Sequence, residues 1–309
     1  MLGLTATTIL ALCAGSAFAQ TPIRVASFNI RYDNTDISIA DTELYWSGLT
    51  CANDPYQCRL FGVASELVNV TSAGDSFVGM QEVLDNQLSD IMGVMQQVGA
   101  WEHIGVARDD GKSDGEYNPI IYRTDVFELV HEETKWLSET PDTPSKSWNS
   151  GSNRIVTVGV FKHIATGRLM IMANTHLDNA VAEARTNQIG VATDIIKAVD
   201  AAYGPNLPTF LTGDFNSGDT DPAYTTLVAE KYLSDMYTSA TAEQRSERFY
   251  TYTGFAGEYS SRIDYIWLGP QSDPAGGPIT IKKYEVMDNV WGTGRMSDHR
   301  AVVGDITLG

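Results

Sequence analysis

The stretch Pro-Thr-Phe-Leu-Thr-Gly-Asp-Phe-Asn, residues 208–216, decides how this chain folds. Its apolar run is short enough for one buried strand, which we expect to end at Gly213. Because successive side chains of an extended backbone point to opposite sides, Asp214 and Asn216 would bring two oxygen groups to one point. Asp and Asn after a strand are also common turn formers. The stretch therefore predicts either a pair of ligands at a strand end or an ordinary turn.

Polar or ionisable residues stand at the edges of other apolar runs. These runs cover residues 23–30, 77–81, 169–175, 262–268 and 301–306. Their edge residues are Asn29, Glu82, His176, Asp178, Asp264, Asp298 and His299. A buried, unpaired charge costs several kcal/mol unless a metal, hydrogen bonds or water compensate it. So many polar residues at strand edges predict one shared cleft.

The hydrophobic periodicity predicts interspersed strands and helices. Strands are expected at residues 23–30, 77–81, 101–107, 118–123, 126–136, 154–163 and 168–175, and around residues 210, 252, 266, 281 and 302. Helices are expected at residues 59–70, 86–97 and 181–201. A hairpin is expected at Thr166-Gly167. This order indicates two packed, mixed sheets flanked by helices.

Six short segments carry a resemblance to a known family. They are Ser-Phe-Asn-Ile-Arg (27–31), Gln-Glu-Val (81–83), Asn-Thr-His-Leu-Asp (174–178), Gly-Asp-Phe-Asn (213–216), Arg-Ile-Asp-Tyr-Ile (262–266) and Ser-Asp-His-Arg (297–300). In this order they resemble the successive signatures of the endonuclease/exonuclease/phosphatase superfamily, which has the DNase I-like fold. The resemblance spans residues 24–307. It implies an α/β (α+β) fold, a four-layer α/β/β/α sandwich of two mixed β-sheets flanked by helices.

Two further segments narrow the resemblance to one branch of that superfamily. Arg-Asp-Asp-Gly-Lys (108–112) and Trp-Leu-Ser-Glu-Thr-Pro (136–141) look like segments of its secreted, deadenylase-related branch. We expect residues 105–115 and the polar loop 138–152 to select the substrate, because the same metal site can act on any phosphoester.

The N-terminus predicts export. Residues 1–20 contain no charged side chain, include an apolar stretch and end in Ala-Phe-Ala-Gln, which is typical of a secretory signal peptide. The alternative is a short buried helix. No later stretch approaches the ~20 apolar residues of a membrane span. We therefore expect a secreted, extracellular, monomeric protein with one domain, residues 21–309, and no obligate protein partner.

Two cysteines and one asparagine have predictions that depend on this compartment. Cys13 lies in the signal peptide, which leaves Cys51 and Cys58. In an oxidising compartment these two are expected to form a disulfide rather than a metal site. Asn69 in Asn-Val-Thr is either an N-glycosylation acceptor or an ordinary residue at a helix end.

The strand-edge residues predict a metal-assisted chemistry. Carboxylate and amide oxygens suit Mg²⁺ or Mn²⁺, with Ca²⁺ also compatible, and not a thiolate-rich zinc or copper site. Phosphoester hydrolysis needs an activated water and stabilisation of the phosphate and of the leaving oxygen, and a divalent ion can serve all three needs. His176 and His299 could exchange a proton near neutral pH.

The resemblance implies a role for each residue around the metal. Glu82 would be the principal metal ligand, with Asn29 beside it, and Asp298 would bind a metal or a water. His299, oriented by a carboxylate that could be Asp264, would be the general base or would polarise the phosphate.

The resemblance also implies how water and substrate are bound. Asp214 and Asn216 would position the attacking water and the phosphate, and His176 would hydrogen-bond a phosphate or leaving oxygen. Glu116 would support His176, and Arg154 would bind the phosphate through its guanidinium. The alternatives for Glu116 and Arg154 are a solvated loop acid and a surface salt bridge.

The prediction for function is a secreted, divalent-metal-dependent phosphoesterase, a hydrolase that cleaves phosphodiester bonds of nucleic acid or nucleotides. A sphingomyelinase-like or inositol-phosphate phosphoesterase is the alternative enzyme, and a non-catalytic binding module of the same fold is the alternative from another class. The net charge of −18 argues against a broad electrostatic hold on polyphosphate but does not exclude a nuclease. Trp136, Trp148 and Trp291 could stack on a base or attach loops to the core.

Overall fold

The computed structural model describes residues 20–34, 43–48, 51, 53–272, 274–275 and 277–309. Except for Gln20, the expected signal peptide lies outside these residues, so it stays a prediction. In the described part of the chain, none of the helices combines the length and the apolar character that crossing a membrane requires.

The first sheet has six strands in the order β11-β14-β1-β2-β4-β3. Its strands are β1 (Thr21–Asn29), β2 (Ser76–Gln81), β3 (Trp101–Ile104), β4 (Ile120–Arg123), β11 (Ile279–Val286) and β14 (Val302–Leu308). Strands β1 and β2 are parallel and the other neighbours are antiparallel. The sheet is therefore mixed.

The second sheet also has six strands, in the order β5-β6-β7-β8-β10-β9. Its strands are β5 (Phe127–Trp136), β6 (Ile155–His163), β7 (Leu169–His176), β8 (Thr209–Asp214), β9 (Ser234–Asp235) and β10 (Asp264–Gly269). Only β7 and β8 pair in parallel in this sheet. A small hairpin, β12 (Val290–Trp291) with β13 (Gly294–Arg295), lies outside both sheets.

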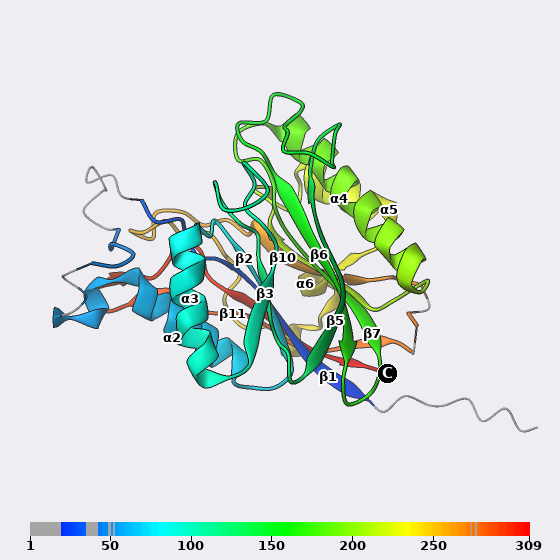
Figure 1. Ribbon diagram of the computed structural model, residues 1–309, viewed down its shortest axis with the longest axis horizontal. Helices are drawn as coiled ribbons and strands as arrows, with labels where there is room; N and C mark the ends of the chain where they lie inside the picture. The colour runs from blue at the N-terminus through cyan, green and yellow to red at the C-terminus, as the bar shows by residue number, and fades with distance from the viewer. Residues whose placement is uncertain (1–19, 35–42, 49–50, 52, 273, 276) are drawn as a thin grey trace, which may run out of the picture.

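Helices cover the outer faces of the two sheets. As Figure 1 shows, α2 (Arg59–Thr71) and α3 (Asp85–Val98) lie on one side of the molecule, and α4 (Ala182–Tyr203) and α5 (Pro222–Glu230) lie on the other. The short helix α6 (Met236–Ser239) follows β9, and two 3-10 turns span Pro55–Gln57 and Ala242–Gln244. The predicted four-layer α/β/β/α sandwich is confirmed.

Three apolar layers hold the sandwich together, and β1 shows why. Along β1, Ala26 and Phe28 pack toward α2 and α3, whereas Ile23 and Val25 pack between the sheets. This alternation follows the two-residue period of a strand whose two faces are both buried. The third layer joins the second sheet to α4 and α5. Asn29, two residues beyond Ser27, therefore continues the face that looks toward the second sheet.

Two segments differ from the expected elements. No strand forms around Tyr252, which makes only isolated bridges with Ser261 and His299. Helix α5 was not predicted, although Asp221 followed by Pro222 matches the preference of proline for the first turn of a helix. The hairpin at Thr166-Gly167 is confirmed, because it joins the antiparallel strands β6 and β7.

Strand register brings the polar strand ends to one end of the sandwich. In the second sheet Asp214 pairs with both His176 and Asp264 across neighbouring strands. In the first sheet Asn29 pairs with Gln81, so Glu82 comes directly after that pair. The start of β1 and the end of β14 lie at the opposite end, where Thr21 pairs with Leu308.

Candidate active site

A buried asparagine joins two carboxylates across the two sheets. The Asn29 side-chain nitrogen donates to Glu82 Oε1 and to Asp214 Oδ2, both at 3.0 Å. The Asn29 side-chain oxygen accepts from the Arg31 backbone nitrogen at 2.9 Å. Asn29 thus lies beside Glu82 as expected, with its amide nitrogen rather than its oxygen toward the carboxylates.

Glu82 is held in an unusual backbone conformation. Its φ is 60°, in the left-handed region that non-glycine residues rarely adopt. The next residue, Val83, accepts a hydrogen bond from the Tyr117 backbone nitrogen at 2.7 Å, which fixes the chain just after the turn. Such a conformation costs of order 1 kcal/mol and is typical of functional sites. The turn aims Glu82 at Asn29.

His299 and Asp264 form a buried pair next to Asp214. His299 Nδ1 donates to Asp264 Oδ2 at 2.9 Å, and His299 Nε2 lies 3.7 Å from Asp214 Oδ2. Burial lowers the pKa of His299, but the charges of Asp264 and Asp214 outweigh it and raise that pKa well above the usual value. Burial and the charge of Asp264 raise the pKa of Asp214 to about 7. These neighbours favour a cationic His299.

His176 has the opposite protonation. Asn216 donates its side-chain N–H groups to His176 Nε2 and to the Leu177 carbonyl, both at 3.0 Å. An amide NH₂ can only donate, so His176 Nε2 is an acceptor and the ring proton is on Nδ1. Burial and the charges of Arg154 and Arg108 lower the pKa of His176 well below its usual value. His176 is therefore neutral.

Glu116 lies near His176 but pairs with an arginine. Glu116 Oε2 is 3.7 Å from His176 Nδ1 and accepts a hydrogen bond from Arg108 Nη1 at 2.7 Å. The side chain is largely buried, so it is not the solvated acid of the alternative interpretation. Burial and the charge of Glu82 raise the pKa of Glu116.

Arg154 is buried beside these groups, with only 4% of its surface exposed. Its Nη2 donates to the Asn179 side-chain oxygen at 3.2 Å, whereas Nε and Nη1 have no hydrogen-bond partner. Arg154 therefore does not form the surface salt bridge that was the alternative interpretation of its sequence context. A buried guanidinium with free N–H groups is suited to an anion.

The two remaining acids at strand edges have different surroundings. Asp298 lies beside His299 in sequence, and burial raises its pKa against the opposing charge of His299. Asp178 instead accepts hydrogen bonds from the Ser150 hydroxyl at 2.8 Å and from the Gly151 nitrogen at 2.7 Å. It also accepts from the Val181 nitrogen before α4. Asp178 thus anchors the loop 138–152.

The acidic residues fit a divalent cation. The potential ligand atoms of Glu82, His176 and Asp214 lie within 4.8 Å of one another, and so do those of Asp214, Asp264 and His299. The donors are carboxylate oxygens and imidazole nitrogens, a set that suits a hard or borderline cation. Burial and the charges of Asp264 and Glu82 raise the pKa of Asp214, an effect that a cation would relieve.

Two arginines near the site had no role assigned from the sequence. Arg31 lies 3.8 Å from Glu82 and 3.5 Å from Glu43. Arg108 pairs with Glu116, eight residues later in the chain. Both residues belong to the quoted family-like segments, but only the fold shows that their side chains reach the site.

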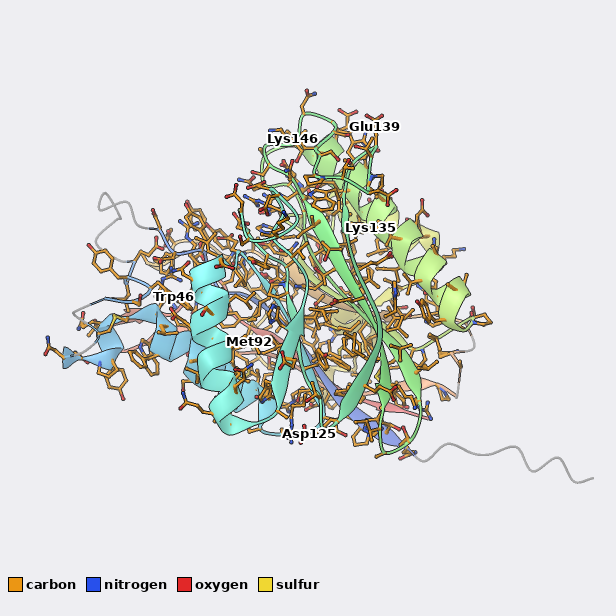
Figure 2. The ribbon with its side chains drawn as sticks, viewed as in Figure 1. Trp46, Met92, Asp125, Lys135, Glu139 and Lys146 are labelled. Atoms are coloured by element: carbon orange, nitrogen blue, oxygen red, sulfur yellow. A yellow bond between two sulfur atoms is a disulfide. The ribbon has the colours of Figure 1, made fainter. Side chains whose placement is uncertain are left out.

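Two of the tryptophans attach loops to the core. Trp136 is 6% exposed and donates to the Arg108 carbonyl at 2.6 Å. Trp291 donates to the Pro55 carbonyl and packs against the Tyr56 ring. Trp148 is half-buried in the loop 138–152. That loop projects beyond the ends of β5 and β6, where Figure 2 labels Glu139 and Lys146.

The modification sites lie away from the strand ends. A disulfide joins Cys51 and Cys58, as predicted. Asn69 is exposed on α2 and donates a long hydrogen bond to Glu66, so its glycosylation stays a prediction.

Solved structures of bacterial proteins share both fold and sequence with this chain. An endonuclease/exonuclease/phosphatase from Bacteroides vulgatus is 32% identical, with a TM-score of 0.78 over 94% of this chain and 100% of that one. A mannosyl-6-phosphatase from Bacteroides thetaiotaomicron is 31% identical, with a TM-score of 0.73 over 92% and 99% of the two chains. The human Nocturnin catalytic domain, 18% identical with a TM-score of 0.68 over 94% and 98%, shares the fold.

Sequence comparisons give the family. A curated relative, the 3'-5'-exoribonuclease subunit Ccr4 of the CCR4-Not complex from Debaryomyces hansenii, is 27% identical over 136 residues. That match covers 38% of this chain and only 16% of the relative. The model of the Endonuclease/Exonuclease/phosphatase family matches residues 26–299. With this match over most of its length, the chain belongs to the endonuclease/exonuclease/phosphatase family.

Proposed function

We propose that this protein is a secreted, divalent-metal-dependent phosphoesterase that hydrolyses small phosphate esters of nucleotides or sugars. The observation that carries the proposal is the row His176, Asp214 and Asp264 across one sheet, completed by His299, which lies three residues before β14 of the other sheet. Family membership supports the reaction class, since these proteins act on phosphoester bonds. The disulfide between Cys51 and Cys58 is compatible with secretion.

Glu82 would hold the cation, with Asn29 and Asp298 beside it. The cation, Mg²⁺ or Mn²⁺, with Ca²⁺ as a third possibility, would lower the pKa of a bound water and neutralise charge on the phosphate. Asn29 joins the Glu82 and Asp214 carboxylates by donating to both.

Asp214 and His299 would perform the proton chemistry. Asp214, whose Oδ2 lies 3.6 Å from His176 Nε2 and 3.7 Å from His299 Nε2, would accept a proton from the attacking water. The water oxygen would bond to phosphorus while the bond to the leaving oxygen breaks. His299, kept cationic by Asp264, would donate from Nε2 to a phosphate oxygen, and Arg154 would bind a second one.

Several observations favour a small substrate over a long polynucleotide. Two of the tryptophans considered for base stacking, Trp136 and Trp291, are engaged in loop contacts. The net charge of −18 gives little general attraction for polyphosphate. The similarity to a mannosyl-6-phosphatase covers nearly the whole chain, whereas the similarity to an exoribonuclease covers 38% of it. Polynucleotide hydrolysis is the second candidate, on the strength of that match.

The non-catalytic binding module is the weaker alternative. It predicts that groups with catalytic chemistry are lost or separated, yet Asp214 Oδ2 lies 3.6 Å from His176 Nε2 and 3.7 Å from His299 Nε2. A structural role alone gives no reason for so many buried ionisable groups in contact.

The test is product release by the purified mature protein with Mg²⁺, Mn²⁺ or EDTA. The substrates are nucleotides, sugar phosphates, inositol phosphates, sphingomyelin, DNA and RNA. We expect metal-dependent turnover of the small esters that falls at least 100-fold in Glu82→Gln and His299→Ala. Asp125→Asn is the matched control, because Asp125 pairs with Arg123 at the opposite end of the sandwich (Figure 2). Full activity in Glu82→Gln would refute the site, and turnover of polynucleotides alone would refute the substrate class.

A further inference from the structure

We infer that Arg108 and Arg154 form a two-guanidinium seat for a terminal phosphate group, so that the enzyme prefers phosphomonoesters to phosphodiesters. The inference rests on the proposed phosphoesterase function and names its substrate class. Arg154 already belongs to the proposed phosphate site, whereas Arg108 adds a second cation to it.

The position of Arg108 is fixed before any substrate binds. Its backbone nitrogen donates to the Glu116 carbonyl at 3.0 Å, which closes the loop between these residues. Its carbonyl accepts from Trp136 Nε1 at 2.6 Å and from the Asn153 side chain at 3.3 Å. Glu116 then holds the guanidinium through Nη1 at 2.7 Å. A cation preorganised in this way loses little entropy when an anion binds.

Unused hydrogen-bond donors gather around this pair of arginines. Among the described residues, Arg108 Nε, Arg154 Nε and Nη1, and His176 Nδ1 are buried and have no hydrogen-bond partner, although Arg108 Nε lies 4.0 Å from Asp109 Oδ1. Burial lowers the pKa of Arg154, and the positive charge of Arg108 lowers it further. The negative charge of Glu116 opposes both effects but does not cancel them. Buried cations and donors are costly unless an anion meets them. The arrangement is therefore incomplete without an anionic ligand.

Glu116 cannot supply the missing negative charge. It carries one charge for two guanidinium groups, and its hydrogen bond goes to Arg108. Arg154 makes no ion pair within 4.0 Å among the described residues, and its one bond goes to the neutral Asn179 side chain. Arg108 also lies 4.0 Å from Asp109 Oδ1, so Arg154 is the guanidinium of the pair that no described carboxylate pairs with directly, next to the carboxylates of Glu82 and Asp214.

The number of donors favours a monoester. A terminal phosphate carries up to two negative charges on three non-bridging oxygens, whereas a diester carries one charge on two. Guanidinium groups bind phosphate through paired N–H bonds, so two of them match the charge and oxygens of the terminal group. A diester would leave part of this donor set buried and unpaired, which is unfavourable.

The kinetic test compares two esters with the same leaving group, 4-nitrophenyl phosphate and bis(4-nitrophenyl) phosphate. We expect the wild type to have the higher kcat/KM for the monoester. In Arg108→Gln the ratio of monoester to diester kcat/KM should fall at least tenfold, and Arg108→Lys should restore it only in part, because lysine cannot bond in a bidentate manner. Arg123→Gln, at the far end of β4, is the matched control and should leave the ratio unchanged.

A binding measurement separates this inference from the proposed function. Inorganic phosphate titrated into metal-free protein by calorimetry should bind at least tenfold more weakly to Arg108→Gln than to wild type and to Arg123→Gln. Equal binding by all three proteins, or an unchanged substrate ratio in Arg108→Gln, would overturn the inference while leaving a phosphoesterase intact. Arg108-dependent phosphate binding without hydrolysis of any ester would support the seat and overturn the proposed function.

Discussion

Replacing Gly79 with alanine should lower the free energy of unfolding, because the two sheets are in direct contact at this residue. A Cβ atom built on Gly79 would lie 2.2 Å from Thr212 Oγ1 and 2.7 Å from the Asn174 side chain, both in the opposite sheet. Cβ atoms essentially never lie within 3.0 Å of a heavy atom to which they are not bonded, so the neighbours must move.

Those neighbours are fixed by hydrogen bonds, which sets the size of the effect. Asn174 donates to the Met80 carbonyl at 2.6 Å and accepts from Gln81 at 2.7 Å and from Thr212 at 3.0 Å. Overpacking a buried site costs about 1–3 kcal/mol. Leaving one buried polar group without a partner costs about 1–3 kcal/mol more. We therefore expect Gly79→Ala to lower the free energy of unfolding by about 2–6 kcal/mol.

Equilibrium unfolding in urea, with the slope checked for two-state behaviour, measures this change. Gly93→Ala is the matched control, because Gly93 is exposed in α3 and its added methyl meets nothing within 4 Å. Helix propensity alone should make that variant about 0.5–1 kcal/mol more stable. A Gly79→Ala protein within 1 kcal/mol of wild type would refute the close contact of the sheets.

Three further outcomes are expected. In metal-free protein, ¹⁵N spectra should show His176 neutral with its proton on Nδ1 from about pH 6 upward, because burial and the charges of two arginines lower its pKa; a charged ring at pH 6 would contradict this. Burial raises the pKa of Glu66, so its contribution to stability is present below about pH 4 and is lost as the pH rises through the folded-state pKa. Glu66→Gln should therefore be more stable than wild type at pH 7 and equal to it in acid, as thermal unfolding would show. Replacing Cys51 and Cys58 by serine should lower stability by about 2–3 kcal/mol, the loop-closure value for so short a loop, and no loss in urea unfolding would contradict it.

The positions of the residues at strand ends were predictable, because a strand and its pairing fix where its last side chains lie. Once residues 209–214 form a buried strand, Asp214 must stand at its end, and parallel pairing with β7 brings His176 to the same edge. Asp264 follows from the antiparallel partner β10. The turn that the sequence left as the alternative also forms, because the Asn216 backbone nitrogen donates to Asp214 Oδ1 at 2.8 Å and Asn216 has a φ of 47°, while Asp214 itself is 1% exposed.

The contacts of loop residues were not predictable in the same way. The sequence placed Glu116 near His176, but not the hydrogen bond from Arg108, which depends on how residues 105–116 fold back on themselves. The orientation of the Asn29 amide is another example, since it follows from what Glu82 and Asp214 need once the two sheets are packed. Side-chain partners across a loop or between sheets are properties of the packed structure.

The two histidines of the site show how packing assigns different properties to similar strand-end residues. His176 and His299 present Nε2 to the same Asp214 oxygen, at 3.6 and 3.7 Å. Behind His299 stands Asp264, a carboxylate that stabilises the imidazolium. Around His176 lie the guanidinium groups of Arg154 and Arg108, which repel a positive ring.

Opposed shifts of this kind assign acid and base roles, since each group is held in one protonation state while Asp214 between them, with a pKa of about 7, can change state. His299 Nε2 thus carries a proton on the side that faces Asp214, and His176 Nε2 is an acceptor. A proton on Asp214 has two histidine neighbours. His299 is already protonated, and the arginines around His176 oppose its protonation. In the mechanism that we propose, the Asp214 carboxylate is therefore the group in this row that would take up the proton of the attacking water.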